Sequence, residues 1–371
     1  MIMMTTHLKQ RGLTLVELMV GAAISLFIVA VILTVFSGSR TIFKVNTNLA
    51  RESEGARMVI GLMREDVRQA AFAGCRYDNQ AVPAGQPPNG AAKSVMTPLA
   101  GFLDGGMLGA VPGYMGHAEQ GGGVFLPALP ANIAPATGST FASNSDVLSI
   151  RLPADPNAQL LTTATVANSP LPVQLAANLA SNNIAVNDVV LITNCKNSEY
   201  FRVTAETAPQ ASGQLSHRLA GNASANLVNA YDTMGTAVYK LQTRHYFVAT
   251  SLVPPGGNAL WRHTVPAPAG TTQPEDWLSG IDGLAVFYGV DVNPIAQLSS
   301  AGRYARANAM TANDWPNVKS VRLEVLSSTV QSGVATGQQA PLQFGGQTLT
   351  FTDSRLHMVT DSIVGLRMVT P

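Results

Sequence analysis

An almost unbroken apolar run near the N-terminus constrains this chain more than any other feature. Residues 13–36 form a stretch of 24 residues with a single charge, Glu17. A helix rises about 1.5 Å per residue, so this run spans roughly 36 Å, enough to cross a bilayer core of about 30 Å. Lys9 and Arg11 precede it, with no acidic residue beside them. Because basic residues hold the short N-terminal side in the cytoplasm, everything after residue 36 is predicted to be exported.

Two ordinary explanations fit this run poorly. A cleaved signal peptide has an apolar region of about 7–15 residues followed by a small-residue cleavage site. Here the run is longer, and it continues past Arg40 into further helical sequence. A plain transmembrane anchor leaves the carboxylate of Glu17 unexplained.

The junction before the run resembles the class III leader of type IV prepilins. It reads Arg-Gly-Leu-Thr-Leu-Val-Glu-Leu from Arg11, with a glycine, a hydrophobic residue and a glutamate at the fifth position after the glycine. The resemblance implies that the prepilin peptidase cuts between Gly12 and Leu13, and that the new amine of Leu13 is then methylated. The apolar helix stays in the mature protein.

Glu17 is predicted to act in assembly. It lies about 6 Å along the helix from Leu13, close enough to the membrane surface to reach water. Among packed apolar helices a lone carboxylate is costly and needs a partner. The natural partner is the N-terminal ammonium of a neighbouring subunit, and the pair would fix the axial register. The alternative is that Glu17 only marks the membrane interface.

The helix is predicted to continue beyond the membrane to residue 73. No proline occurs in 40–73, and apolar residues recur at steps of three and four. These are Ile42, Val45, Leu49, Ala56, Val59, Ile60, Met63, Val67 and Ala70. One helix over 13–73 would be about 90 Å long, apolar all round in its first half and amphipathic in its second.

Several later segments are similar to PilW-type minor pilins. They are 49–52, 56–57, 63–70 and the Gly-Cys pair at 74–75, then 280–284, 287–291, Trp315 with 318–322, and a final strand containing Asp353, Arg355, Leu366 and Arg367. The resemblance implies an α+β, pilin-like fold in which the long N-terminal helix packs on an antiparallel β-sheet, with a large loop-rich insertion. The expected divisions are a leader (1–12), a membrane or filament-core helix (13–36), its amphipathic continuation (37–74) and a β-rich periplasmic domain (75–371).

Strand-like runs support the β-rich domain. They occupy 146–152, 188–195, 199–204, 238–248, 260–264, 281–292, 318–328 and 356–369. Residues 188–195 and 199–204 are predicted to pair as a hairpin. Residues 238–248 and 260–264 are predicted to form another hairpin across the turn at 254–257. Residues 79–145 are rich in proline and glycine, which excludes helix for most of the stretch and leaves a surface excursion or a small subdomain open.

Cys75 and Cys195 are the only cysteines. In an oxidising compartment, two cysteines predict one disulfide. Closing a loop of this size stabilises a fold by roughly 4–5 kcal/mol in the chain-entropy model. Two buried free thiols are an alternative, whereas a metal pair lacks nearby ligands.

No catalytic, metal or cofactor motif stands out. Zinc-protease, nucleophile-elbow, phosphate-loop and calcium-loop patterns are all missing, and the six histidines lack ligand spacing. Residues 244–246 and 262–263 are interpreted as strand residues with one face in solvent. Net charge is +1 and charged residues make up 12%, so no nucleic-acid binding is expected. We therefore expect no enzyme and no cofactor.

The resemblance implies a minor pilin that helps to prime a type IV pilus or forms the filament tip. Its implied partners are the prepilin peptidase, other minor pilins, the major pilin and a large tip adhesin. It would sit in the inner membrane with a cytoplasmic N-terminus and a periplasmic domain before entering the filament. Two alternatives remain open: a pseudopilin of type II secretion, and a periplasmic enzyme or binding protein on a plain anchor. A methylated Leu13 would exclude the second.

Overall fold

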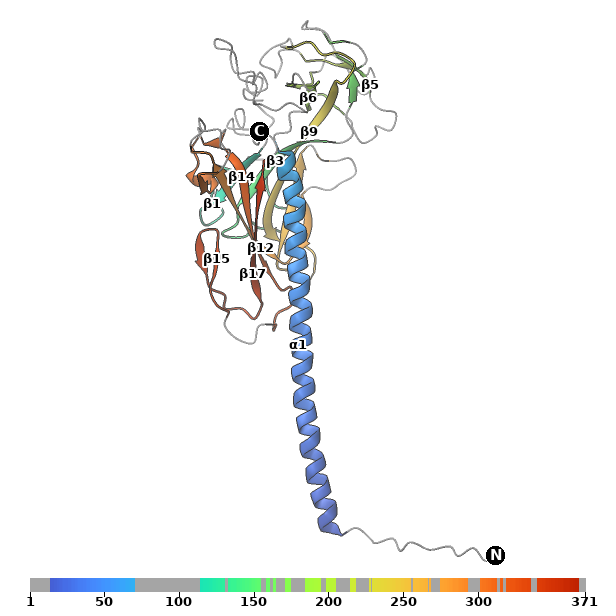
Figure 1. Ribbon diagram of the computed structural model, residues 1–371, viewed down its shortest axis with the longest axis vertical. Helices are drawn as coiled ribbons and strands as arrows, with labels where there is room; N and C mark the ends of the chain where they lie inside the picture. Colours follow the sequence, from blue (N-terminus) through green and yellow to red (C-terminus); the bar gives the residue numbers. More distant parts are fainter. Residues whose placement is uncertain are drawn as a thin grey trace, which may run out of the picture.

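The computed structural model describes most of the chain in separate ranges. They are 14–70, 114–130, 133–154, 158–160, 163–164, 171–174, 184–194, 198–204, 214–217, 227, 229–254, 256–265, 267, 274–292, 301–311, 314–315, 318–334 and 339–366. Within them one long helix rises from below a β-rich body and packs along its side (Figure 1).

Helix α1 (Leu15–Gln69) is continuous, as predicted over this range. It has no proline, and Thr14 caps its first turn. Hydroxyl groups inside the apolar half bond back to carbonyls one turn earlier: Ser25 Oγ donates to Gly21 O at 2.7 Å and Thr34 Oγ1 to Ala30 O at 2.9 Å. The apolar half therefore presents few unsatisfied polar groups to its surroundings.

A large antiparallel sheet is built around the long strand β9 (Ala237–Thr250). The other members are β1 (Tyr114–Glu119), β2 (Phe125–Leu126), β3 (Val147–Pro153), β4 (Ala158–Leu160), β5 (Leu171–Gln174), β6 (Val189–Thr193), β7 (Ser198–Arg202), β8 (Gln214–Leu215), β10 (Asn258–Val265) and β11 (Glu275–Ser279). The beginning of β9 pairs with β4 and β6, and the rest of it pairs with β3 and β10. One strand thus serves two groups, and we call β4–β8 the distal group (upper part of Figure 1).

A second sheet has the strand order β13-β12-β14-β17. Its strands are β12 (Ile281–Val290), β13 (Arg303–Ala305), β14 (Val318–Ser328) and β17 (His357–Gly365), and a short 3-10 turn follows β13 at Ala307–Ala309. The hairpin of β15 (Leu342–Phe344) and β16 (Gln347–Leu349) covers its outer face. Glycine at 283 makes this cover possible, because a Cβ there would lie 2.8 Å from the Phe344 ring.

The main core lies where α1 meets both sheets. It contains Val59, Ile60, Met63, Val67 and Ala70 of the helix with Leu148, Ile150, Tyr246, Val248 and Leu260 of the large sheet and Leu284, Val286, Tyr288, Val321, Leu323 and Val325 of the second. Buried apolar area of this kind supplies most of the driving force for packing the helix. The α+β, pilin-like prediction is confirmed.

Every predicted strand has a counterpart in the structure, and both hairpins pair as expected. The turn between β9 and β10 uses Gly256 and Gly257, both with positive φ, 84° and 94°. One prediction needs correction. Asp353 and Arg355 precede the final strand, which spans His357–Gly365, and Leu366 follows it.

The described end of the 79–145 stretch is neither a surface excursion nor a separate subdomain. Residues 114–119 form β1, which pairs with β3 in the large sheet. Phe125 and Ile133 then lie on the outer face of that sheet, against Phe247 and Trp261. Residues 79–113 lie outside the described ranges.

Candidate assembly site

The first turn of α1 holds Glu17 in a capping box with Thr14. Glu17 Oε2 accepts from the Thr14 backbone N–H and from Thr14 Oγ1, each at 3.0 Å, while Glu17 N–H donates to Thr14 Oγ1 at 3.3 Å. Both residues are exposed. The box satisfies orphan donors of the helix end and fixes the direction of the carboxylate. Sequence reasoning missed this role of Thr14, although Thr-x-x-Glu is the pattern that signals it.

The cleavage residues Gly12 and Leu13 lie immediately before the described range. Their processing stays a prediction, as does the assembly role of Glu17. The structure does place Glu17 at the end of the helix where a cut after Gly12 would create the new amine.

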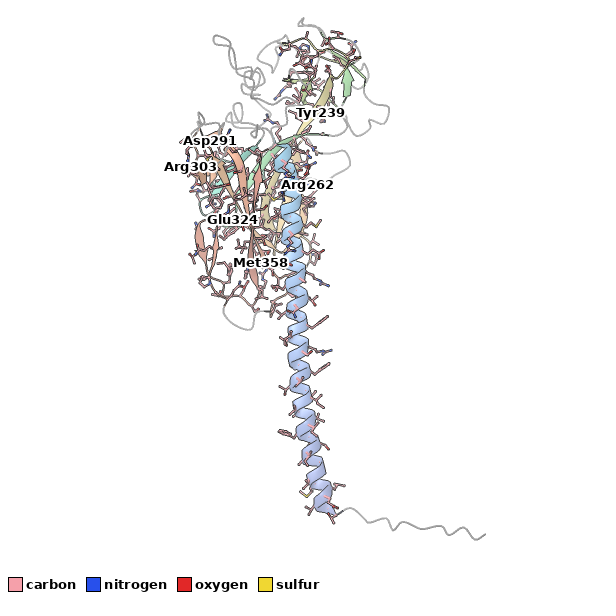
Figure 2. All side chains as sticks on the ribbon, in the orientation of Figure 1. Tyr239, Arg262, Asp291, Arg303, Glu324 and Met358 are labelled. Carbon is pink, nitrogen blue, oxygen red and sulfur yellow. The ribbon has the colours of Figure 1, made fainter. Side chains whose placement is uncertain are left out.

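The first half of α1 touches no other described part of the chain. Every residue from 14 to 44 is exposed, including large apolar side chains such as Phe27 at 72% and Phe43 at 74%. Figure 2 shows side chains projecting on both sides of this part of the helix. By length and composition the helix can cross a membrane.

The second half of α1 is fixed to the large sheet by a buried acid. Asp66 accepts two hydrogen bonds from Arg244 Nη1, at 2.8 and 2.9 Å, and a third from the hydroxyl of Tyr246. Tyr246 is 1% exposed, and the Asp66 side chain is 8% exposed. Burial and the neighbouring carboxylate raise the pKa of the Tyr246 hydroxyl, which therefore stays a donor at neutral pH.

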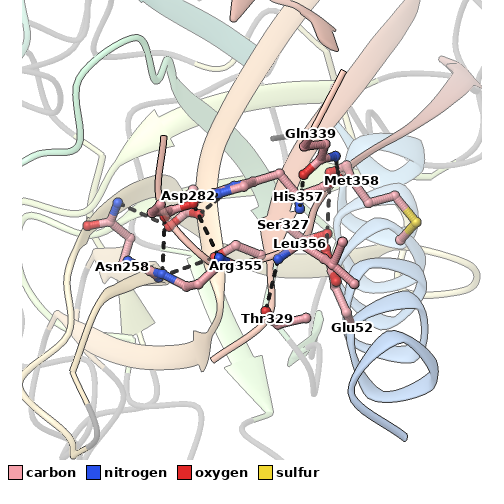
Figure 3. Close-up of polar contacts among 12 residues, drawn as sticks. Glu52, Asn258, Asp282, Ser327, Thr329, Gln339, Arg355, Leu356, His357 and Met358 are labelled. Atoms are coloured by element: carbon pink, nitrogen blue, oxygen red, sulfur yellow. Dashed lines mark hydrogen bonds and ion pairs between the residues drawn. The ribbon is translucent and has the colours of Figure 1, made fainter. Parts of the chain in front are cut away.

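A second buried acid fixes the same helix to the second sheet. Glu52 Oε1 accepts from Ser327 Oγ at 3.0 Å, close to the start of β17 (Figure 3). Burial raises the pKa of Glu52, and the Ser327 bond works against that rise. Glu52 and Asp66 lie on the apolar stripe of the helix, about four turns apart.

His357, at the start of β17, lies in a polar cluster beside this contact (Figure 3). Its Nε2 lies 2.8 Å from Asp353 Oδ1, and its Nδ1 lies 3.5 Å from Asp282 Oδ2. Burial opposes protonation, but the bonds to Asp282 and Asp353 prevail and raise the pKa of His357. The amide of Gln339 bonds both the N–H and the C=O of the His357 backbone.

The outer face of the large sheet carries a different histidine group. His245 is fully buried, its Nδ1 lies 2.7 Å from Ser149 Oγ, and its ring lies 5.9 Å from that of His263. Burial and the nearby imidazoles of His263 and His117 lower the pKa of His245 to about 3. These are strand residues, as predicted, but the expectation of a solvated face is wrong for His245 and Tyr246. The long middle strand of a covered sheet is buried on both sides.

Cys75 and Cys195 both lie outside the described residues, so their disulfide stays a prediction. Within the described ranges, no group of three or more His, Cys, Asp or Glu side chains is arranged to hold a metal ion.

Two families match separate parts of the chain. The prokaryotic N-terminal methylation motif matches residues 7–33, which include the leader junction and the start of α1. The type IV pilus-assembly protein W family, PilW, matches residues 245–367, from the middle of β9 to just past β17. No curated protein and no solved structure matches the chain.

The two matched regions agree with the two halves of the structure. The methylation motif covers the exposed apolar part of α1 and indicates that this helix anchors the chain in a membrane. The PilW match covers the second sheet, on which the other half of the helix packs. Together the two matches support a PilW-type pilin and indicate a minor-pilin-like subunit of type IV pilus assembly.

Proposed function

We propose that this protein helps to prime assembly of a type IV pilus or forms the filament tip. The observation that carries the proposal is the division of α1: residues 14–44 are all exposed, whereas the buried residues all lie from Glu52 onward. A free apolar half helix can pass from lipid into a bundle of similar helices without disturbing its domain. The domain, on the other half, then stays outside the bundle.

Processing comes first in this proposal. The prepilin peptidase cuts after Gly12 on the cytoplasmic side, Leu13 is methylated, and the domain waits in the periplasm above the inner membrane. Other minor pilins, the major pilin and a large tip adhesin are the proposed partners. We further propose a structural rather than catalytic role, because both matched families concern pilin processing and pilus assembly.

The capping box explains how Glu17 would meet a neighbour. Both described hydrogen bonds of the Glu17 carboxylate use Oε2, and Oε1 has no described hydrogen-bond partner. The carboxylate is therefore oriented before any partner arrives, which lowers the entropic cost of pairing. A neighbour's ammonium shifted along the axis could then bind Oε1 while Thr14 keeps Oε2.

Three variants test this function. Glu17→Ala removes both the cap and the charge, Glu17→Gln keeps the cap acceptor without the charge, and Thr14→Ala keeps the charge without the cap. Loss of one partner of a buried ion pair costs about 3–5 kcal/mol, so both Glu17 variants should insert and be cleaved normally but fail to enter the assembly. Thr14→Ala should be only mildly impaired.

The measurement is co-purification with other minor pilins, together with the level of each variant in sheared filaments. If Glu17→Ala equals wild type in both, the carboxylate only marks the membrane interface. If Glu17→Gln equals wild type and Glu17→Ala does not, the cap matters and the charge does not.

A further inference from the structure

The final strand leaves one long edge of the second sheet unpaired. β17 pairs with β14 along its whole length without a register shift, and it is the last strand of its sheet. The other edge strands of the described sheets, β2, β7, β8, β11, β13, β15 and β16, have two to five residues, whereas β17 has nine. Proteins usually keep exposed edges short, because each edge is a template for another strand.

Hydrogen bonds show which residues of β17 point outward. Leu356 O accepts from Thr329 N–H, and Leu366 N–H donates to Lys319 O, so the even-numbered positions face β14. His357, an odd-numbered position, turns its N–H and C=O outward, where the Gln339 side chain binds both. Gln339 therefore already imitates one residue of an added strand.

The next outward positions have no such partner. No described residue forms a hydrogen bond with the backbone of Val359, Asp361, Ile363 or Gly365 on this edge. The last three are exposed, with Ile363 at 55% and the Asp361 side chain at 56%. The open edge from 359 to 365 is about 23 Å long and offers an antiparallel strand about six hydrogen bonds from its first three positions.

We propose that this edge of β17 binds an extended segment of another component of the pilus assembly by strand addition. The proposal rests on the assembly function for the source of the segment and on the free edge for the mode of binding. Main-chain hydrogen bonds give such a contact its affinity, and alternate side chains give it specificity.

The side chains beside the edge define the segment. Arg322 lies 2.7 Å from Glu324 and 3.5 Å from Asp361, so two carboxylates share one guanidinium and the surface is locally acidic. Ile363 and Val359 flank Asp361 on the same face of the strand. The incoming strand should therefore carry a basic residue opposite Asp361, with an apolar residue two positions away on either side.

Strand β17 of a second copy of this chain does not meet that requirement. Pairing β17 with itself places Asp361 opposite another Asp361, or opposite Val359 or Ile363 when the register shifts. Either arrangement buries a carboxylate against a like charge or an apolar side chain. The edge chemistry therefore opposes self-pairing of β17, and we take the segment to come from a different protein of the assembly.

The test uses the full-length chain in cells that build pili. A benzophenone amino acid is placed at 359 or at 363, and the cross-linked peptides are identified by mass spectrometry. Both positions should capture one segment, at residues four apart and in reverse order. Capture of another copy of this chain, of unrelated segments, or of no protein would overturn the proposal.

Variants at the edge then separate strand addition from simple proximity. Ile363→Pro removes an outward N–H but no bond to β14, whereas Ile363→Ala keeps the N–H. Cross-linking from 359 should fall at least tenfold for Ile363→Pro and less than twofold for Ile363→Ala. Asp361→Lys, at an exposed position, should also reduce it at least tenfold, so the test does not depend on how the proline variant folds. Equal cross-linking in all three variants would refute strand addition.

The two proposals fail differently. If the cross-link pattern is missing but assembly still depends on Glu17, only the proposal of strand addition at the β17 edge fails. An intact cross-link pattern, together with Glu17 variants that assemble as well as wild type, would count against the proposed role of the helix.

Discussion

Replacing Asp66 with alanine should loosen the helix from the large sheet more than any other single change on α1. The variant leaves Arg244 and Tyr246 without their shared acceptor. Removing one member of a buried pair costs about 3–5 kcal/mol. The Arg244 side chain is 26% exposed, so water compensates in part, and we expect the lower end, about 3 kcal/mol. That is on the order of a hundredfold change in the unfolding equilibrium.

Urea unfolding of the full-length protein in detergent measures this change. Trp277 is a suitable fluorescent reporter, because its ring lies 5.9 Å from that of Tyr246. Asp66→Asn, which keeps a hydrogen-bond acceptor, should lose about 2 kcal/mol. Glu65→Ala is the matched control, since Glu65 is exposed on the next position of the same helix, and it should change the stability by less than about 0.5 kcal/mol.

Unfolding of Asp66→Ala at the same urea concentration as the Glu65→Ala control would show that Asp66 does not hold the helix. Arg244 and Tyr246 would then be satisfied by water, and apolar packing alone would hold the helix.

Further predictions concern processing, the cysteines and acid. Gly12→Val should leave the uncut precursor in the membrane, seen by its size on a gel, and normal cleavage would overturn the leader assignment. Thiol labelling of denatured, unreduced protein should find no free Cys75 or Cys195, and two labelled thiols would exclude the disulfide. The pKa of His245 is lowered to about 3, so below about pH 6.5 this residue binds a proton in the unfolded chain but not in the folded chain. The free energy of unfolding should therefore fall on acidification, with His245 contributing a loss of about 2 kcal/mol at pH 5. His245→Gln should lower that loss, and urea midpoints at pH 7.5 and pH 5 measure it; an unchanged loss would show that His245 is not its source.

The helix and the longer strands could be predicted from local patterns alone. A long apolar run and an apolar period near 3.6 are properties of contiguous residues, and they located α1 and the packed stripe of Val59, Met63 and Val67. The strands around β9 and β14 were equally visible, because they are long and rich in β-branched residues. β1 was missed because its sequence, Tyr-Met-Gly-His-Ala-Glu, has no β-branched residue and follows a proline-rich stretch.

The contacts that fix the helix were harder to predict. Asp66 and Arg244 are 178 residues apart, and no local pattern links them. A usable signal did exist, since Glu52 and Asp66 fall on the apolar stripe of the helix, where an acid requires a buried partner. The identity of that partner depends on how β9 crosses the helix, which only the fold determines.

The sharing of β9 between the two groups of strands has a mechanical consequence. A force applied to the distal group would enter the rest of the domain along this strand and along its neighbour β3, which precedes β4 in the chain. The force would act at the same time on the hydrogen bonds that join the two edges of β9 to β3 and to β10. Arg244 and Tyr246 belong to the same strand and hold Asp66, so the force would pass directly from β9 to the long helix. The distal group and the anchoring helix are therefore joined by one continuous strand, which gives tension between them a path that does not run through the second sheet.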